Sequence, residues 1–360
     1  MGYGPGSALR PFPAPHLHEG PTTAGMMFSV VLCLLPAGIW GVLLFGQRAL
    51  HVLLVSVGAS LLTELAVSGL FLRRFTLADG SALLTGLLLG YSLPPAVPLF
   101  IPAAASFFAI AVIKQSFGGL GRNWLNPALG ARVFVMFSWT GPMTRWQAPL
   151  AAADVLSGAT PLGLAKEALS HPVPGLRGPI ELLLAGLRPS GLRAGPLSDL
   201  LQRLGRLAPA GYGQMALGNV AGCIGEGSAL LLALGSIYLF VKKIIAWEIP
   251  AAYLGSFGLL AWAFGGLPFG AGLFRGDAAF HLLAGGLALG ALYMAADPVT
   301  SPLKRPGRLI FGLGCGALTF LLRTWGSQPE GVALAVVLMN MFVPLLNRIG
   351  GRPISREAEQ

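Results

Sequence analysis

The stretch Met26-Met-Phe-Ser-Val-Val-Leu-Cys-Leu-Leu-Pro-Ala-Gly-Ile-Trp-Gly-Val-Leu-Leu-Phe-Gly46 contains no charged side chain. A helix needs about 20 consecutive, mainly apolar residues to cross a membrane, and this stretch meets that requirement. Strands of a membrane barrel would instead alternate apolar and polar residues over about ten positions. The whole chain agrees, because 54% of its 360 residues are hydrophobic and only 11% are charged. The sequence therefore predicts an all-α polytopic membrane protein.

Similar apolar runs recur along the chain and give ten predicted transmembrane helices. The runs lie at about residues 26–46, 50–70, 81–97, 99–117, 125–140, 216–240, 248–268, 278–296, 307–323 and 331–347. They divide the chain into an N-terminal segment (1–24), a first half of five spans (25–140), a long connection (141–215), a second half of five spans (216–347) and a tail (348–360).

The basic residues lie at the ends of apolar runs and form no basic face, so the net charge of +10 does not indicate nucleic-acid binding. Cytoplasmic loops carry an excess of Lys and Arg. With a cytoplasmic N-terminus, only Arg48, Arg275 and Arg323 fall in short outer loops. Both termini are therefore expected in the cytoplasm and the long connection outside it. The basic residues on the cytoplasmic side are then Arg10, Arg73, Arg74, Lys114, Arg122, Lys242, Lys243, Lys304, Arg305, Arg308, Arg348, Arg352 and Arg356.

Two halves with five spans each would make any internal repeat an inverted one. A weak internal similarity exists, because Asp79–Gly86 begins the third span and the similar sequence Asp277–Gly285 begins the eighth. These two spans end at Pro94-Pro95 and Asp297-Pro298. Proline-interrupted segments at corresponding places point to a central binding site. Chance similarity between two Leu/Gly-rich helices explains this internal similarity equally well.

Three polar side chains fall inside predicted spans, where they are costly enough to suggest a function. Glu64 is a candidate for an ion path, but a structural ion pair with Arg132 of the fifth span is slightly favoured. Glu226 is either an ion-path residue or a cap at the membrane interface. His281 stands alone on an apolar helix and is interpreted as a packing residue.

Two polar stretches interrupt the apolar pattern near the expected cytoplasmic face. In Asp297-Pro-Val-Thr-Ser-Pro302 a proline breaks the helix while side chains supply oxygens, which indicates a site. In Gly118–Ala128 the amides of Asn123 and Asn126 offer both donors and acceptors, which suit a flavin ring, a sugar or a phosphate. For this second stretch, a glycine turn with an Asn cap is favoured on these residues alone.

The long connection contains Asp154-Val-Leu-Ser-Gly-Ala-Thr-Pro-Leu162, where small residues surround the hydroxyl of Thr160. A phosphate ester on that threonine is chemically reasonable. The alternative, favoured for an arbitrary tetrapeptide of this kind, is an Asp or Ser helix cap followed by a proline that opens or interrupts a helix. The cysteines, Cys33, Cys223 and Cys315, stand alone, so this chain by itself builds neither an iron–sulfur cluster nor a zinc site.

Six motifs in this order resemble one known family, formed by the D subunit of Rnf electron-transport complexes and the B subunit of sodium-translocating NADH:quinone reductase. The chain has only about 25 residues before its first span, which resembles the Rnf branch. The motifs are Ser-Ala-Leu-Leu-Thr-Gly (81–86), Ser-Leu-Pro-Pro (92–95), Gly-Gly-Leu-Gly-Arg-Asn-x-x-Asn-Pro-Ala (118–128), Ser-Gly-Ala-Thr-Pro-Leu (157–162), Ile-Gly-Glu-x-Ser-Ala-Leu (224–230) and Asp-Pro-Val-Thr-Ser-Pro (297–302).

The resemblance implies two flavins. FMN would be attached to Thr160 through a phosphoester bond, by a flavin transferase that recognises the pattern formed with Asp154, Ser157, Gly158 and Ala159. A second flavin, riboflavin, would lie among the membrane helices. The resemblance implies that Asn123, Asn126 and Asp297 form the site of this second flavin.

The resemblance also implies a function, an electron relay in the cytoplasmic (inner) membrane coupled to Na⁺ or H⁺ movement. Its partners would be the lipid bilayer and the other Rnf subunits, including those with iron–sulfur and flavin centres. The chain alone would hold no metal and no complete active site, and no G-x-G-x-x-G follows a strand to bind NAD. The main alternative is a redox-inert permease or channel, and a third possibility is a structural anchor for redox partners. Neither alternative gives Thr160 a role in electron transfer, whereas the relay requires it to carry FMN.

Overall fold

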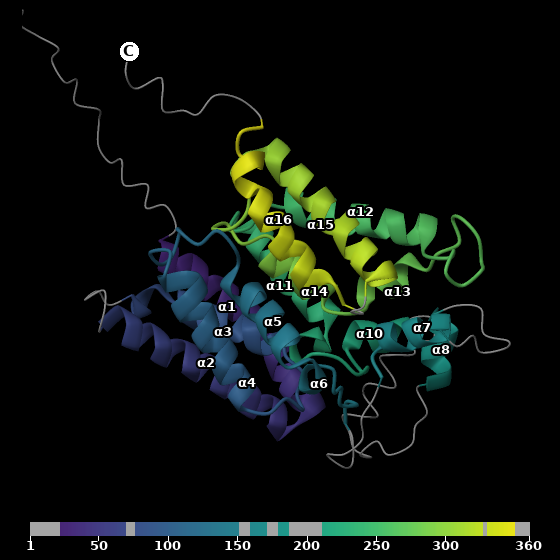
Figure 1. Ribbon diagram of the computed structural model, residues 1–360, viewed down its shortest axis with the longest axis horizontal. Helices are drawn as coiled ribbons and strands as arrows, with labels where there is room; N and C mark the ends of the chain where they lie inside the picture. Colours follow the sequence, from purple (N-terminus) through teal and green to yellow (C-terminus); the bar gives the residue numbers. More distant parts are fainter. Residues whose placement is uncertain are drawn as a thin grey trace, which may run out of the picture.

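The computed structural model describes residues 22–69, 76–150, 159–170, 179–186, 211–326 and 330–349. Every regular element in these ranges is a helix (Figure 1). In the first half they are α1 (Thr23–Phe45), α2 (Gln47–Val67), η2 (Leu77–Asp79), α3 (Ser81–Tyr91), α4 (Phe100–Phe107), η3 (Phe108–Gln115), α5 (Pro127–Ser138) and α6 (Thr140–Met143). Next come α7 (Pro161–Ser170), α8 (Pro179–Gly186) and α10 (Tyr212–Leu217). The second half contains η4 (Ile224–Gly227), α11 (Ala229–Val241), α12 (Glu248–Phe264), α13 (Ala278–Leu283), α14 (Leu287–Leu289), η5 (Gly290–Met294), α15 (Arg305–Trp325) and α16 (Val332–Leu346).

Each predicted apolar run contains helix, but the helices differ in length. Helices α1 and α2 are each long and apolar enough to cross a membrane, whereas α3, α5, α11 and α16 and the continuous α4–η3 helix are apolar but shorter. Helix α3 ends at Tyr91 because Pro94 and Pro95 follow within four residues and cannot continue it. The all-helical class is confirmed, while the number of membrane crossings stays a prediction.

The sixth predicted run, 216–240, is not one helix. Helix α10 ends with Gly218 at φ +76°, and a glycine-rich turn leads to η4 before α11 begins at Ala229. Ser228 caps α11, because its hydroxyl accepts a hydrogen bond from the Leu231 amide at 3.2 Å. The backbone of Ile224 instead donates to Leu93, just past α3, at 3.1 Å. Residues 218–228 therefore form an irregular link between the two halves.

The eighth predicted run, 278–296, is also broken. Helix α13 stops at Leu283, Gly285 and Gly286 adopt φ values of +68° and +64°, and the chain resumes as α14 and η5. Left-handed backbone of this kind is unstrained for glycine and disfavoured for other residues. The glycine pair therefore places a helix end and a helix start inside the bundle.

The two halves lie side by side, with α1 to α5 on one side and α11 to α16 on the other (Figure 1). Their helices pack through glycine, as where Gly86 of α3 meets Val57 of α2 and Gly316 of α15 meets Tyr253 of α12. Small residues at such contacts let two backbones approach closely.

One pair of contacts occurs in both halves. The hydroxyl of Tyr91, at the end of α3, lies on Gly38 of α1 and donates to the Leu34 carbonyl at 2.8 Å. The hydroxyl of Tyr293, near the end of η5, lies on Gly235 of α11 and donates to the Leu232 carbonyl at 2.9 Å.

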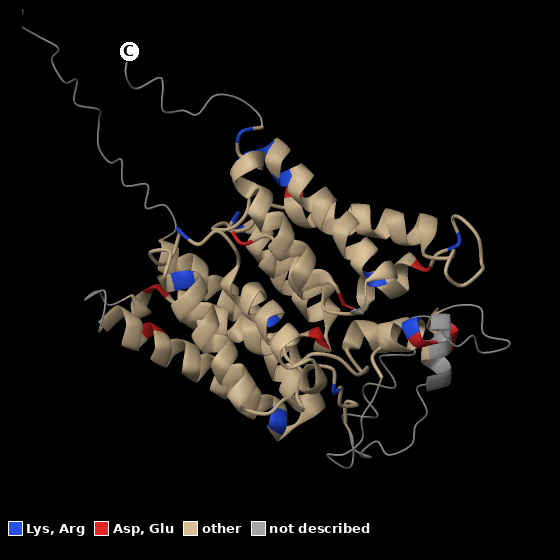
Figure 2. Cartoon of the chain, viewed as in Figure 1, with Lys and Arg blue, Asp and Glu red and all other residues tan. Residues whose placement is uncertain are grey.

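The outer faces of the helices are apolar, and charged side chains are sparse on them (Figure 2). Side chains such as Leu32 and Ile39 of α1 and Leu54 of α2 are about 60% exposed. Soluble proteins rarely leave contiguous apolar surface of this kind uncovered, whereas a lipid bilayer covers it without cost. Most charged groups within the bundle are paired, as described below.

Candidate functional site

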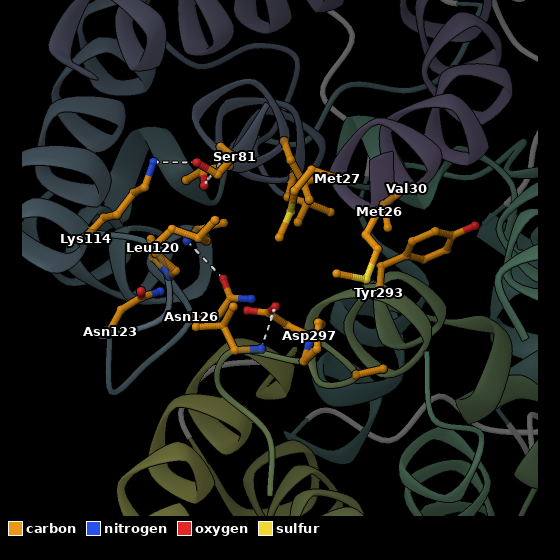
Figure 3. A pocket seen from close by; sticks show the side chains of 18 of the residues that line it. Met26, Met27, Val30, Ser81, Lys114, Leu120, Asn123, Asn126, Tyr293 and Asp297 are labelled. Atoms are coloured by element: carbon orange, nitrogen blue, oxygen red, sulfur yellow. Dashed lines mark hydrogen bonds between the residues drawn. The ribbon is translucent and has the colours of Figure 1, made fainter. Parts of the chain in front are cut away.

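A pocket lies between the two halves (Figure 3). The first half contributes Met27 of α1 and Ser81 of α3, and the second contributes Tyr293 of η5. Its walls are mainly apolar with a few polar groups, as is usual for small-molecule sites. Asn123, Asn126 and Asp297, which were selected from the sequence, all line this cavity. We call it the interhalf pocket.

Asn126 combines a structural role with a place in the pocket. Its side-chain oxygen caps α5 by accepting hydrogen bonds from the Ala128 and Leu129 amides at 3.0 and 3.3 Å, as the Asn-cap interpretation predicted. Its amide nitrogen donates to the Met294 carbonyl at 3.2 Å and so joins α5 to η5 of the other half. The side chain is therefore held in one orientation at the edge of the pocket.

Asn123 differs, because its side-chain oxygen has no hydrogen-bond partner among the described residues although the side chain is only 7% exposed. A buried acceptor without a donor is unfavourable by about 1–3 kcal/mol, so such a group is a candidate for ligand binding. Asp297 is held more firmly, since its carboxylate accepts hydrogen bonds from the Val299 amide and the Thr300 hydroxyl, both at 3.2 Å.

A buried ion pair borders the same pocket. Lys114 of η3 lines it and lies 3.0 Å from Glu64 of α2, and the lysine also donates to the Ser81 hydroxyl at 2.7 Å. The predicted pairing of Glu64 with Arg132 is therefore wrong. Sequence reasoning counted Lys114 only as a topology signal, although an isolated lysine at the end of an apolar run was a sign of a buried partner.

Replacement of Lys114 with methionine is expected to lower the free energy of unfolding by about 3–5 kcal/mol, because Glu64 would remain buried without its counter-charge. The double variant Lys114→Met, Glu64→Leu should recover much of that loss. Thermal unfolding of the purified protein measures both. A double variant no more stable than the single one would contradict the pairing.

Arg132 pairs instead with Glu330, which directly precedes α16. Cys223 lies beside this pair, with its sulfur 3.5 Å from the Arg132 guanidinium and 3.9 Å from a Glu330 oxygen. Glu226 is partly buried and lies against Gly222, and one of its oxygens has no partner among the described residues. The ligand atoms of Cys223, Glu226 and Glu330 lie within 4.8 Å of one another. The adjacent guanidinium disfavours a metal cation there.

Arg323 was expected in a short outer loop, and that prediction is wrong. It lies in the last turn of α15, and its side chain is only 7% exposed. Its guanidinium donates to the carbonyls of His281, Ala284 and Gly285 at 2.7–2.9 Å, and its Nε donates to the Glu330 carbonyl at 3.1 Å. Arg323 thus satisfies the carbonyl groups that the break after α13 leaves without helical partners. His281 packs edge-on against Phe280, as predicted for a packing residue.

The flavin-attachment pattern is described only in part. Asp154, Ser157 and Gly158 lie outside the described residues, Ala159 is exposed, and Thr160 is 5% exposed. The Thr160 hydroxyl oxygen accepts a hydrogen bond from the Gly163 amide at 3.0 Å. Thr160 is therefore the N-cap of α7, whereas the cap interpretation of the sequence assigned that role to an Asp or Ser.

Helix α7 belongs to a small apolar cluster outside the main core. Leu162 packs with Phe280 of α13 and directly on Gly285, so the helix that Thr160 caps lies against the α13–α14 break. Tyr212 of α10 ties the same region together by donating to Asp277 at 2.6 Å. Burial and this carboxylate raise the pKa of Tyr212 to about 12, so its phenol stays protonated at neutral pH.

Broken helices, an apolar exterior and paired internal charges define this chain as a polytopic α-helical membrane protein with an internal pocket between its halves. Residues 12–353 match the model of the NQR2, RnfD, RnfE family. The chain belongs to this family, and the resemblance found in its motifs is confirmed.

Three similar proteins are named as D subunits of ion-translocating oxidoreductase complexes. The chain is 42% identical to the D subunit of a proton-translocating ferredoxin:NAD(+) oxidoreductase complex from Clostridium ljungdahlii, over 93% of this chain and 92% of the relative. It is 40% identical to the D subunit of an ion-translocating oxidoreductase complex from Stutzerimonas stutzeri, over 90% and 89%. It is 37% identical to the D subunit of a Na(+)-translocating ferredoxin:NAD(+) oxidoreductase complex from Acetobacterium woodii, over 93% and 91%. Proteins of similar overall identity are thus named for different ions.

Proposed function

We propose that this chain is the flavin-carrying membrane subunit of an Rnf-type ferredoxin:NAD oxidoreductase complex. It relays electrons through FMN on Thr160 and a second flavin in the interhalf pocket, coupled to Na⁺ or H⁺ movement. The observation that carries the proposal is the convergence of Asn123 and Asn126, from the first half, with Asp297, from the second half, on one cavity.

The residues of the interhalf pocket suit a flavin. A bound flavin supplies reversible electron storage on a flat ring with hydrogen-bond donors and acceptors on one edge. The unpaired oxygen of Asn123 offers an acceptor for a ring N–H, and the side chains of Met27 and Leu88 offer apolar contacts for the ring face. Asn126 and Asp297, both fixed by internal hydrogen bonds, would hold the polar edge in one orientation.

The position of Thr160 supports attachment of a phosphate. A helix N-terminus favours negative charge, because its free amide groups and the helix dipole both face the anion. A phosphate on the N-cap hydroxyl of α7 would lie there, and the ester oxygen could still accept from Gly163. Since Thr160 is 5% exposed, the flavin transferase must act before this packing forms or while it is open.

We further propose ten spans in two inverted halves, with the long connection outside the cytoplasm and both termini inside it. The matched contacts of Tyr91 on α1 and Tyr293 on α11 support the repeat. The helix pairs agree as well: α2 packs on α3 and on the α4–η3 helix, as α12 packs on α13 and on α15. A repeat of this kind places a shared site between the halves, where the interhalf pocket lies.

The partners follow from the same proposal. The relatives' names specify multi-subunit complexes, so we expect the remaining Rnf subunits, with their iron–sulfur and flavin centres, to exchange electrons with this chain. A permease would use the same pocket for a solute and would hold no flavin. An anchor would assemble the complex and leave electron flow independent of Thr160.

Replacement of Asn123 with leucine is expected to lower the content of acid-extractable flavin in the purified protein. The loss of one hydrogen bond should weaken flavin binding about five- to thirtyfold, whereas folding should be little affected because the oxygen has no internal partner. Gln147→Leu is a matched control, since this amide oxygen is also buried and unpaired among the described residues but lies outside the pocket. Equal flavin loss in both variants would argue against the assignment.

A further inference from the structure

A second hollow, with a volume of about 450 Å³, lies where α12 and α15 begin. It is lined by Lys243 from the α11–α12 turn, by Arg305 and Arg308 from the first turn of α15, and by Glu248 from the first turn of α12. We call it the basic hollow. No residue proposed above to bind a flavin or an ion lines it.

Its charges favour an anion. The Glu248 side chain is buried and holds the two guanidinium groups, lying 3.3 Å from Arg305 and 3.9 Å from Arg308. Arg308 is fixed further, because its Nε donates to the Pro302 carbonyl at 3.1 Å. Three basic side chains face one carboxylate, and Lys243 has no ion pair among the described residues. The lining therefore carries a surplus of positive charge around an open space.

The rim of the basic hollow is apolar and exposed. Trp247 and Leu303, which line it, are 63% and 73% exposed. Tryptophan is enriched at the boundary between the lipid headgroups and the acyl chains, where its ring meets both. A soluble anion would make no favourable contact with this apolar rim. A membrane lipid carries acyl chains beside its phosphate, and these chains can pack against the rim.

We propose that the basic hollow binds the phosphate headgroup of an anionic phospholipid, with its acyl chains along Trp247 and Leu303. Basic pockets between transmembrane helices recognise lipid headgroups in this way. The hollow shares a wall with the interhalf pocket, formed by Ile244, Ile245, Ala296 and Pro298. A bound lipid would therefore back one wall of that pocket, whatever the pocket contains.

Native mass spectrometry of the full chain in a non-ionic detergent tests this proposal, with phosphatidylglycerol and phosphatidylcholine of identical acyl chains as probes. Phosphatidylglycerol should bind at least about tenfold more tightly. Lys243→Gln should weaken its binding about fivefold, and Lys243→Gln with Arg308→Gln about twentyfold. Lys243→Gln keeps every described ion pair intact, so its effect does not depend on folding. Arg275→Gln, another exposed basic residue, should leave binding unchanged.

Equal affinity for the two lipids, or equal weakening by Lys243→Gln and Arg275→Gln, would overturn the proposal. Soluble glycerol phosphate should bind far more weakly than phosphatidylglycerol. If it binds as tightly, the hollow recognises a free phosphate and the lipid assignment is wrong. None of these outcomes depends on flavin content, so this proposal and the proposed function fail independently.

Discussion

Thr160→Ala is expected to abolish covalent flavin completely. The purified wild-type protein, made in a host that has the flavin transferase, should keep its yellow-green fluorescence on a denaturing gel under ultraviolet light. The variant should show none, because the phosphoester requires this hydroxyl. A non-covalent flavin would be lost from both bands on denaturation, so the gel reports the tether alone.

The cap role of Thr160 must be separated from the flavin role, since loss of an N-cap by itself costs about 1 kcal/mol. Thr160→Asn keeps an acceptor for the Gly163 amide but has no hydroxyl to esterify. It should fold like the wild type and still lack fluorescence. Thr140→Ala, at the start of the short helix α6, should retain it. Fluorescence that survives in Thr160→Asn would place the flavin elsewhere.

Arg323→Met is expected to destabilise the protein by at least about 4 kcal/mol. The change would leave the carbonyls of His281, Ala284 and Gly285 without the guanidinium donors, and each unsatisfied buried acceptor costs about 1–3 kcal/mol. The Glu330 carbonyl would keep its second donor, the Val332 amide at 2.8 Å. Inside a membrane the free-energy cost of these unsatisfied carbonyls is not reduced by solvent, because lipid offers no replacement donors.

Thermal unfolding in detergent measures this loss, and Arg275→Met is the control. Arg275 is exposed, so its replacement should change stability by less than about 1 kcal/mol. Arg323→Lys should recover part of the loss, since an ammonium has three donors where the guanidinium here uses three nitrogens for four bonds. If Arg323→Met unfolds like the wild type, the guanidinium does not hold the helix break together.

The helices could be predicted from the sequence because long apolar runs identify membrane helices locally. Their interruptions were harder to predict. The break in α13–α14 depends on two adjacent glycines, Gly285 and Gly286, but glycine is frequent throughout these spans and mostly serves packing. Only the backbone conformation, with both residues at positive φ, separates the two roles.

Among the residues of the candidate site, the polar stretches are visible in the sequence, whereas the ion pairs are not. Asn123, Asn126 and Asp297 each lie in a polar stretch that interrupts an apolar pattern, but the family resemblance, and not the pattern alone, selected them for the second flavin. The structure brings all three to one pocket, and their role in binding a flavin stays a prediction. The ion pairs could not be predicted, since the partner of a buried charge depends on which helix faces which. Glu64 meets Lys114 because α2 packs on η3, and Arg132 meets Glu330 because α5 packs on α16.

Glu64, Glu226 and Asp297 remain the candidates for coupling electron flow to an ion. Glu64 is buried in α2 and pairs with Lys114, which lines the interhalf pocket. Glu226 lies in the irregular link at residues 218–228, and Asp297 lines the pocket itself. A charge-removing substitution of Glu64 or Glu226, if that residue couples the two processes, should abolish ion transport in the reconstituted complex while the flavins stay bound. At Asp297 the same substitution should also weaken binding of the second flavin. Unchanged ion-coupled electron transfer would retire that residue as a candidate.

The flavin content of the purified full chain tests the central claim most directly. Acid precipitation should release one flavin per chain into the supernatant and leave one in the pellet, bound to Thr160. Absence of flavin from both fractions, for protein made in a host with the flavin transferase, would contradict the electron-relay function and favour a redox-inert permease.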